Sequence, residues 1–138
     1  MPIFDASSVQ AALRKLRGDA APILDGQTVL DLTLYELGNI VWKENRASGG
    51  EPREATEKVK AIVRLISIMD IWRIDPGEMA AIAENASRYG LTFYDSAYLT
   101  AALKAGAHLV TEDTDILRAA NKAGLTASQI EQYLKTIS

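Results

Sequence analysis

The chain has 138 residues, which suits a single domain spanning residues 1–138 that can bury about two-thirds of the surface its unfolded form exposes. It contains no cysteine, which excludes disulfides, thiolate catalysis and cysteine-ligated zinc. The net charge of −3 argues against a simple basic surface for nucleic acid.

Short apolar runs and amphipathic stretches alternate along the first half of the chain. The pattern predicts strands at residues 2–4 and 27–32, and helices at 8–17, 33–46 and 52–69. The loop ASGGEP separates the second helix from the third. Pro52 suits the first turn of that third helix, because an N–H at this position has no partner within the helix.

The second half of the chain continues the alternation. It predicts strands at residues 71–74 and 107–110, and helices at 76–89, 94–104, 115–123 and 127–137. Ser128 and Glu131 have the spacing of a capping box at the start of the last helix. Strands that alternate with helices indicate an α/β fold with a parallel sheet, and neither a repeat nor a second domain is evident.

Nothing in the sequence predicts a membrane segment. No apolar run reaches the roughly 18 residues that a membrane helix needs. The first residues, MPIFDASS, lack the basic start of a signal peptide. A cytoplasmic protein is therefore expected.

Several carboxylates lie where predicted strands end or helices begin. Asp5 and Asp113 each come directly after an apolar strand pattern. Glu36 lies in a Thr-x-x-Glu run after another such pattern, and Asp95 lies in a run of the same form after GLTF. Taken singly, each is explained by helix capping, and Asp115 is explained as a first-turn acid favoured by the helix dipole.

Taken together, these acids predict one site. The carboxyl ends of parallel strands, and the helix starts beside them, meet at the same edge of an open sheet, where ligands bind in α/β proteins. Four carboxylates gathered there repel one another, and capping gives no reason to gather them. A divalent cation does, and oxygen-only ligands favour Mg²⁺ or Mn²⁺.

Other kinds of site have little support in the sequence. His108 is the single histidine and lies at the start of a strand, so a Ser-His-Asp triad is poorly supported. No phosphate-binding glycine motif of either common form occurs. Asp75 is most simply a helix cap before Pro76, and Glu112 is expected to face water.

The stretches FDASS, LYELGNIVWKE and YDSAYLTAALKAGAHLVTEDTDIL resemble PIN-domain ribonucleases, above all the VapC-type toxins of toxin–antitoxin pairs. The resemblance implies a three-layer α/β/α fold with a central parallel sheet of about five short strands. It implies active-site acids at Asp5, Glu36, Asp95 and Asp113, with Asp115 as a further metal ligand. Ser7 and Asn39 match supporting polar positions, although FDASS departs from the more usual D-[ST]-[ST] run.

The function implied by this resemblance is metal-dependent endonucleolytic cleavage of RNA by the toxin of a VapBC-type pair, with Mg²⁺ or Mn²⁺ as cofactor. It also implies a homodimer and a VapB-type antitoxin. Candidates for phosphate contacts are Arg14, Lys43 and Arg46, although a solvated surface charge is the simpler explanation of each. The alternatives are a Mg²⁺-dependent phosphatase of another α/β family and a PIN-like binding module without catalysis. The RNA target and the number of metal ions stay open.

The sequence also gives a weak independent motive for a protein partner. Trp42 lies beside the packed face of its predicted helix, and Tyr133 and Leu134 lie beside the apolar stripe of the last helix. All three are therefore expected to be exposed, and exposed apolar surface favours a docking site.

Overall fold

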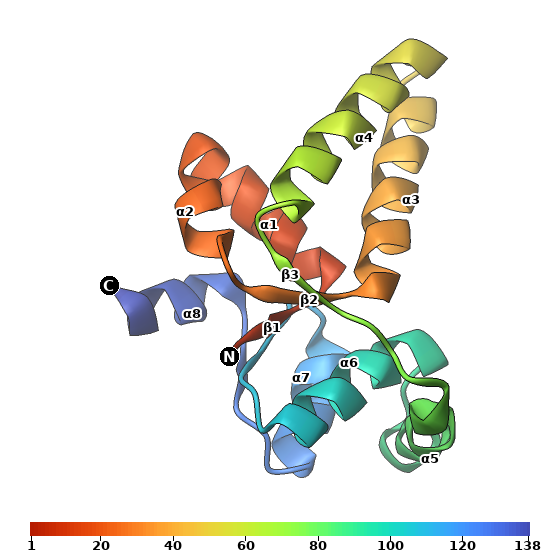
Figure 1. Ribbon diagram of the computed structural model, residues 1–138, viewed down its shortest axis with the longest axis vertical. Helices are drawn as coiled ribbons and strands as arrows, with labels where there is room; N and C mark the ends of the chain where they lie inside the picture. The colour runs from red at the N-terminus through yellow and green to blue at the C-terminus, as the bar shows by residue number, and fades with distance from the viewer.

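The computed structural model describes residues 1–138, and its centre is one sheet of five parallel strands (Figure 1). The strands are β1 (Ile3–Phe4), β2 (Thr28–Leu30), β3 (Asp70–Trp72), β4 (Leu109–Val110) and β5 (Ala127–Ser128). Their order across the sheet is β3-β2-β1-β4-β5, so β1 lies in the middle. Both residues of β1 and both of β4 are fully buried, as apolar strands covered on both faces should be.

Eight helices and two single 3-10 turns complete the chain. The helices are α1 (Ala6–Leu16), α2 (Ala20–Leu24), α3 (Asp31–Ala47), α4 (Pro52–Ile66), α5 (Met79–Tyr89), α6 (Phe93–Ala105), α7 (Thr114–Lys122) and α8 (Ile130–Ile137). The 3-10 turns are η1 (Arg17–Asp19) and η2 (Pro76–Glu78). None of the helices is both long and apolar enough to cross a membrane.

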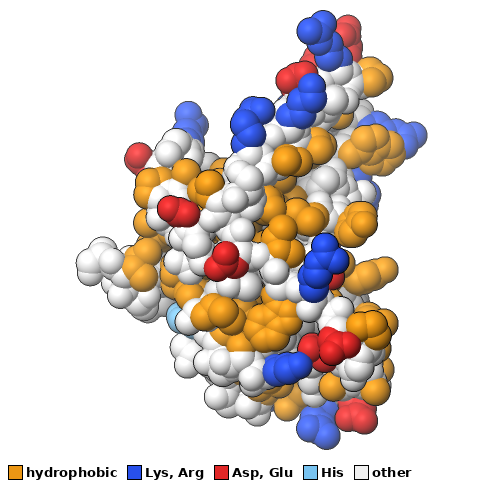
Figure 2. Space-filling view, in the orientation of Figure 1, with side chains coloured by type: hydrophobic (Ala, Val, Ile, Leu, Met, Phe, Trp, Pro, Cys, Tyr) orange, Lys and Arg blue, Asp and Glu red, His pale blue; other side chains and the backbone are white.

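The helices form a layer on each face of the sheet, which confirms the predicted three-layer α/β/α fold. In Figure 1, α1 to α4 lie above the sheet and α5 to α7 lie below it. The upper core packs Phe4 and Val9 with Tyr133 of α8, and the lower core packs Ile3 with Ile82 and Tyr98. The α3–α4 hairpin extends away from the sheet, and Figure 2 shows several Lys and Arg side chains along it.

The predicted start of the last helix is wrong. Residues 127 and 128 form the edge strand β5, because the backbone N–H of Thr111 donates to Ser128 O. The Ser128 hydroxyl therefore does not cap a helix, and it lies 2.7 Å from His108 Nε2. Helix α8 begins at Ile130, whose N–H donates to Glu112 Oε2, so Glu112 caps this helix instead of facing water.

The predicted exposure of the apolar residues is only partly correct. Trp42 is 50% exposed, as expected, whereas Tyr133 is 4% exposed. Tyr133 is buried because its ring packs edge-on against Phe4 and against His108. The exposed apolar side chain of α8 is instead Ile137. The short helix α2 is not among the predicted elements.

Two glycines in helical segments should respond in opposite directions to alanine. Gly106 ends α6 with a φ of +62°, so Gly106→Ala should lower the free energy of unfolding by about 1 kcal/mol. Gly38 lies inside α3 with open space around its Cα, so Gly38→Ala should raise it by about 0.5–1 kcal/mol. Urea unfolding of both variants measures the difference, and equal shifts of the same sign would contradict these local structures.

Candidate active site

A cavity of about 270 Å³ lies at the carboxyl end of the sheet and is lined by four acids. Asp5 follows β1, Glu36 lies in α3, Asp95 lies in the first turn of α6, and Asp113 begins α7. Its remaining lining residues are Ala6, Ser7, Gln10, Asn39, Ile40 and Tyr98. The structure thus brings together four carboxylates that are far apart in the sequence. A larger cavity of about 600 Å³ lies between α3 and α4, but no acid or histidine lines it.

Asp5 is the most deeply buried of the four acids, with 4% of its surface exposed. It caps α1, and its Oδ1 accepts hydrogen bonds from Ser8 N at 2.9 Å and from the Ser7 hydroxyl at 2.7 Å. Its Oδ2 accepts a short hydrogen bond from the Thr111 hydroxyl. Burial raises the pKa of Asp5, and these hydrogen bonds oppose the rise.

Two hydroxyls join Asp5 to the loop after β4. The Ser7 hydroxyl donates to Asp5 and accepts from Glu112 N at 2.9 Å. The Thr111 hydroxyl donates to Asp5 and accepts from Asp113 N at 3.0 Å. Because a hydroxyl has only one hydrogen, the loop N–H groups leave each of them oriented to donate to Asp5. Sequence reasoning did not single out Thr111, although it follows an apolar strand pattern directly, as Asp5 does.

Glu36 is half-buried and is held by a tyrosine. The Tyr98 hydroxyl donates to Glu36 Oε1 at 2.5 Å, and it lies 2.7 Å from Thr33 Oγ1. Burial raises the pKa of Glu36, and the charges of Asp5 and Asp95 raise it further, against the hydrogen bond from Tyr98. Burial and the neighbouring Glu36 also raise the pKa of Tyr98, which therefore stays protonated.

The capping explanation of Glu36 is wrong. Helix α3 begins at Asp31, two residues before Thr33, so Thr33 is not its N-cap. The Thr33 hydroxyl instead accepts from Leu30 N at 3.1 Å. Glu36 therefore lies beyond the first turn and has no capping role. Sequence reasoning did not find Tyr98, and its only local signal is that it lies one helical turn after Asp95 on the same helix.

The carboxylate of Asp95 neither caps a helix nor forms an ion pair. Its own N–H donates to the hydroxyl of Thr92, which caps α6. Burial raises the pKa of Asp95, and the negative charge of Asp113, followed by those of Asp5 and Asp115, raises it further, while Thr92 opposes the shift. The carboxylate is thus free to accept an external partner.

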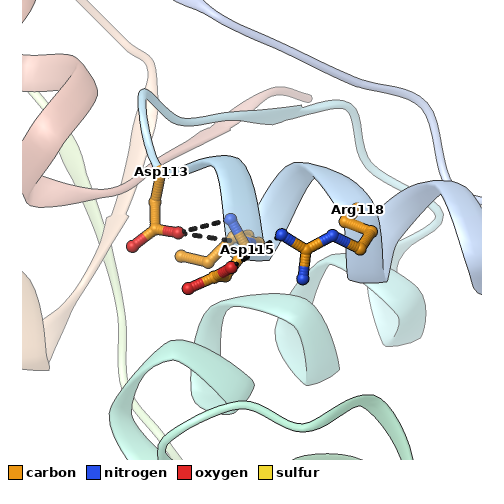
Figure 3. Close-up of polar contacts among 4 residues, drawn as sticks. Asp113, Asp115 and Arg118 are labelled. Carbon is orange, nitrogen blue, oxygen red and sulfur yellow. Dashed lines mark hydrogen bonds and ion pairs between the residues drawn. The ribbon is translucent and has the colours of Figure 1, made fainter.

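Asp113 and Asp115 lie close together at the start of α7 but differ in role (Figure 3). Asp113 caps the helix, because its Oδ1 accepts from Asp115 N at 2.8 Å and from Ile116 N at 3.2 Å. Asp115 is exposed, and its carboxylate pairs with Arg118 at 2.9 Å. Asp113 lines the cavity and Asp115 does not, so the structure leaves Asp115 outside the group of four acids.

Of the remaining candidate residues, one lines the cavity and three do not. Asn39 lines the cavity one helical turn after Glu36. The three candidate phosphate-binding residues do not line it: Arg14, Lys43 and Arg46. Arg14 instead pairs with Glu44 at 2.9 Å, and the Arg46 guanidinium lies 5.4 Å from the centre of the Trp42 ring.

The chemistry of the cavity fits a hard divalent cation. All its charged side chains are carboxylates. The charges of neighbouring acids raise the pKa of Glu36 and of Asp95, which is a repulsion that a cation relieves. No group of three or more acidic or histidine side chains is arranged to hold one ion as it stands. Mg²⁺ usually keeps several waters and needs only one or two carboxylates, so a closed cage of acids is not required.

Comparisons with known proteins agree with this fold. Over 89 residues, or 64% of the chain, it is 34% identical to Exonuclease VapC9 of Pyrobaculum aerophilum. The match spans 63% of that relative, slightly under two-thirds of its length. The crystal structure of PAE2754 from Pyrobaculum aerophilum superposes with a TM-score of 0.79 and 28% identity, over 98% of this chain and 94% of that one.

Two more distant solved structures share the fold. One is VapC20 of Mycobacterium tuberculosis, described as a sarcin–ricin loop cleaving toxin, with a TM-score of 0.61 and 20% identity over 91% of this chain and 97% of that one. The other is VapBC2 of Rickettsia felis bound to a DNA fragment from its promoter, with a TM-score of 0.60 and 16% identity over 93% and 97%. Residues 3–122 match the PIN domain, and the chain belongs to the PIN-domain family.

Proposed function

We propose that the protein is a Mg²⁺- or Mn²⁺-dependent endoribonuclease and the toxin of a VapBC-type pair. The observation that carries the proposal is the single cavity lined by four carboxylates from four elements. VapC names among the relatives support it, as does the description of VapC20 as a toxin that cleaves the sarcin–ricin loop. VapC9 is named an exonuclease, so the position of the cut must be part of the test.

In this mechanism Asp5, Asp95 and Asp113 would hold the cation at the carboxyl end of the sheet. When bound, the ion supplies an activated water and offsets negative charge that develops on the phosphate. Asp5 and Asp113 use their Oδ1 atoms to cap helices. Asp113 Oδ2 is therefore free for this role, and Asp5 Oδ2 keeps one lone pair beside its hydrogen bond from Thr111. Glu36 lines the same cavity and would orient the attacking water or hold a second ion.

Two alternatives have weaker support. A phosphatase of the haloacid-dehalogenase type needs a second acid two positions after the first, where this chain has Ser7, whose hydroxyl only supports Asp5. A PIN-like module without catalysis needs no cavity acids. Capping accounts for Asp5 and Asp113 but not for Glu36 or Asp95, so the complete set favours catalysis.

Partners are also part of the proposal. No Lys or Arg of this chain lines the acidic cavity, so nothing within the chain neutralises its charge. A VapB-type antitoxin that inserts an Arg would do so with paired hydrogen bonds and would block metal and RNA together. The VapBC2 complex among the similar structures supports an antitoxin partner. We further propose a homodimer.

Removal of one cavity charge should abolish cleavage. Asp95→Asn keeps the size of the side chain but weakens cation binding, so RNA cleavage should fall on the order of 100-fold or more. The assay is incubation of 5′-labelled, 3′-labelled and circular RNA with Mn²⁺, followed by mapping of the ends. Asp25→Asn, at an exposed acid outside the cavity, is the control. Full activity of Asp95→Asn would reject the catalytic site, and failure to cut circular RNA would reject the endonuclease.

The same variant should change how stability depends on pH when no metal is bound. The pKa of Asp95 is raised above its ordinary value of 3.8, so the folded protein binds this proton more tightly than the unfolded chain does. Stability from this group is therefore present at low pH and is lost as pH rises through the folded-state pKa. With EDTA present, Asp95→Asn should melt above the parent at pH 7, and the difference should shrink toward pH 4. A variant that is less stable at pH 7 would show that repulsion does not dominate.

The association state gives a separate test of the proposed partners. Light scattering at micromolar concentration should report a dimer, and a strict monomer would rule the dimer out.

With the antitoxin bound, replacing its inserted Arg by Ala should weaken inhibition, and rising Mg²⁺ should compete with the antitoxin. A complex that still takes up Mn²⁺ at the cavity would contradict this mode of inhibition.

A further inference from the structure

Three consecutive hydrogen bonds lead from the end of β2 to Glu36. Leu30 N lies 3.1 Å from Thr33 Oγ1, Thr33 Oγ1 lies 2.7 Å from the Tyr98 hydroxyl, and that hydroxyl lies 2.5 Å from Glu36 Oε1. Leu30 and Thr33 are fully buried, and Tyr98 is 1% exposed. Water therefore has little access to the middle of this series.

The direction of the series is fixed by the number of hydrogens available. An ionised carboxylate only accepts, so the single hydroxyl hydrogen of Tyr98 points to Glu36. Tyr98 must then accept from Thr33, whose own hydroxyl accepts from the Leu30 N–H. The backbone at the end of β2 thus orients both hydroxyls, and reversal of one bond would leave a buried donor without a partner.

Glu36 needs such a partner more than Asp5 and Asp113 do. Asp5 and Asp113 are short side chains fixed by backbone N–H groups at the helices they cap. Glu36 lies beyond the first turn of α3, where every N–H is used by the helix, and its longer side chain has more rotamers to lose. Tyr98 is the one side chain that donates to it.

We propose that Tyr98, oriented by Thr33, is a positioning residue that holds Glu36 by Oε1 and so presents Oε2 to the cavity. The inference rests on the proposed function, in which Glu36 orients the attacking water or holds an ion. The ring of Tyr98 packs in the lower core, and only its hydroxyl takes part in the series. Deletion of the hydroxyl therefore separates positioning from packing.

The primary test is Tyr98→Phe compared with Tyr133→Phe. Tyr133 is also buried, but it packs in the upper core and its hydroxyl makes no hydrogen bond. Loss of an outer partner of a catalytic group typically costs about 10- to 100-fold. Tyr98→Phe should lower kcat for Mn²⁺-dependent RNA cleavage by this factor with little change in KM, while Tyr133→Phe stays within twofold of the parent. A Tyr98→Phe enzyme with the parent's kcat would overturn the proposal.

A double-mutant cycle shows whether Tyr98 acts through Glu36. If it does, Tyr98→Phe should have no further effect on single-turnover cleavage or on Mn²⁺ affinity in the Glu36→Ala background. The same loss in both backgrounds would show that the hydroxyl acts independently. Thr33→Ser, which keeps the hydroxyl, should behave as the parent, whereas Thr33→Val should lose part of the activity.

Crystal structures of the parent and of Tyr98→Phe keep the inference testable even if the proposed function fails. A parent that neither binds Mn²⁺ nor cleaves RNA would reject the function alone. The Glu36 carboxylate should occupy one position in the parent and several rotamers in Tyr98→Phe. If it stays in place without the hydroxyl, Tyr98 does not position it.

Discussion

The hydrogen bonds around the buried carboxylate of Asp5 hold the carboxyl end of the sheet together. Asp5 directly follows β1, the central strand of the sheet, and caps α1. Its two oxygens accept from Ser8 N, from the Ser7 hydroxyl and from the Thr111 hydroxyl. Burial of the negative charge is unfavourable, and these donors are what make it tolerable. Ser7 and Thr111 also accept from the backbone of the loop that carries Asp113, so these contacts position two of the four cavity acids.

Capping and ligand binding are compatible in this arrangement. An N-cap uses one carboxylate oxygen for helix N–H groups and contributes about 1 kcal/mol. Asp5 and Asp113 each do this with Oδ1. The second oxygen of Asp113 accepts no hydrogen bond, and that of Asp5 keeps one lone pair beside its hydrogen bond from Thr111. The N-cap hydrogen bonds therefore orient the carboxylates of these two acids. Asp95 is the third residue of α6, and its backbone N–H donates to the hydroxyl of Thr92, the N-cap of that helix.

Much of the fold and the four acids could be predicted from local sequence. Periodicity marks the long helices, and acids that follow apolar strand patterns reach one edge of a parallel sheet whatever the loops between them do. Contacts between distant residues could not be predicted. Thr111 reaches Asp5 across 106 positions and Tyr98 reaches Glu36 across 62, and neither pairing leaves a local trace.

The errors have the same origin. Ser128 and Glu131 fit a capping box by spacing, but residues 127 and 128 pair with β4 as a two-residue strand, which is too short to show periodicity. Tyr133 was expected to be exposed because a helix viewed alone does not reveal which face meets its neighbours. Its burial depends on Phe4, at the opposite end of the chain.

The cap on α8 has a consequence for local unfolding. Glu112 accepts from Ile130 N through its side chain, while its own N–H donates to Ser7 beside the cavity. The next amide along the chain, that of Asp113, donates to Thr111. Fraying of the first turn of α8 therefore releases the side chain of Glu112. The backbone N–H of the same residue donates to Ser7, which lines the acidic cavity. Amide protons at 112, 113 and 130 should thus exchange with solvent as one cooperative unit, although they belong to a loop and to a C-terminal helix.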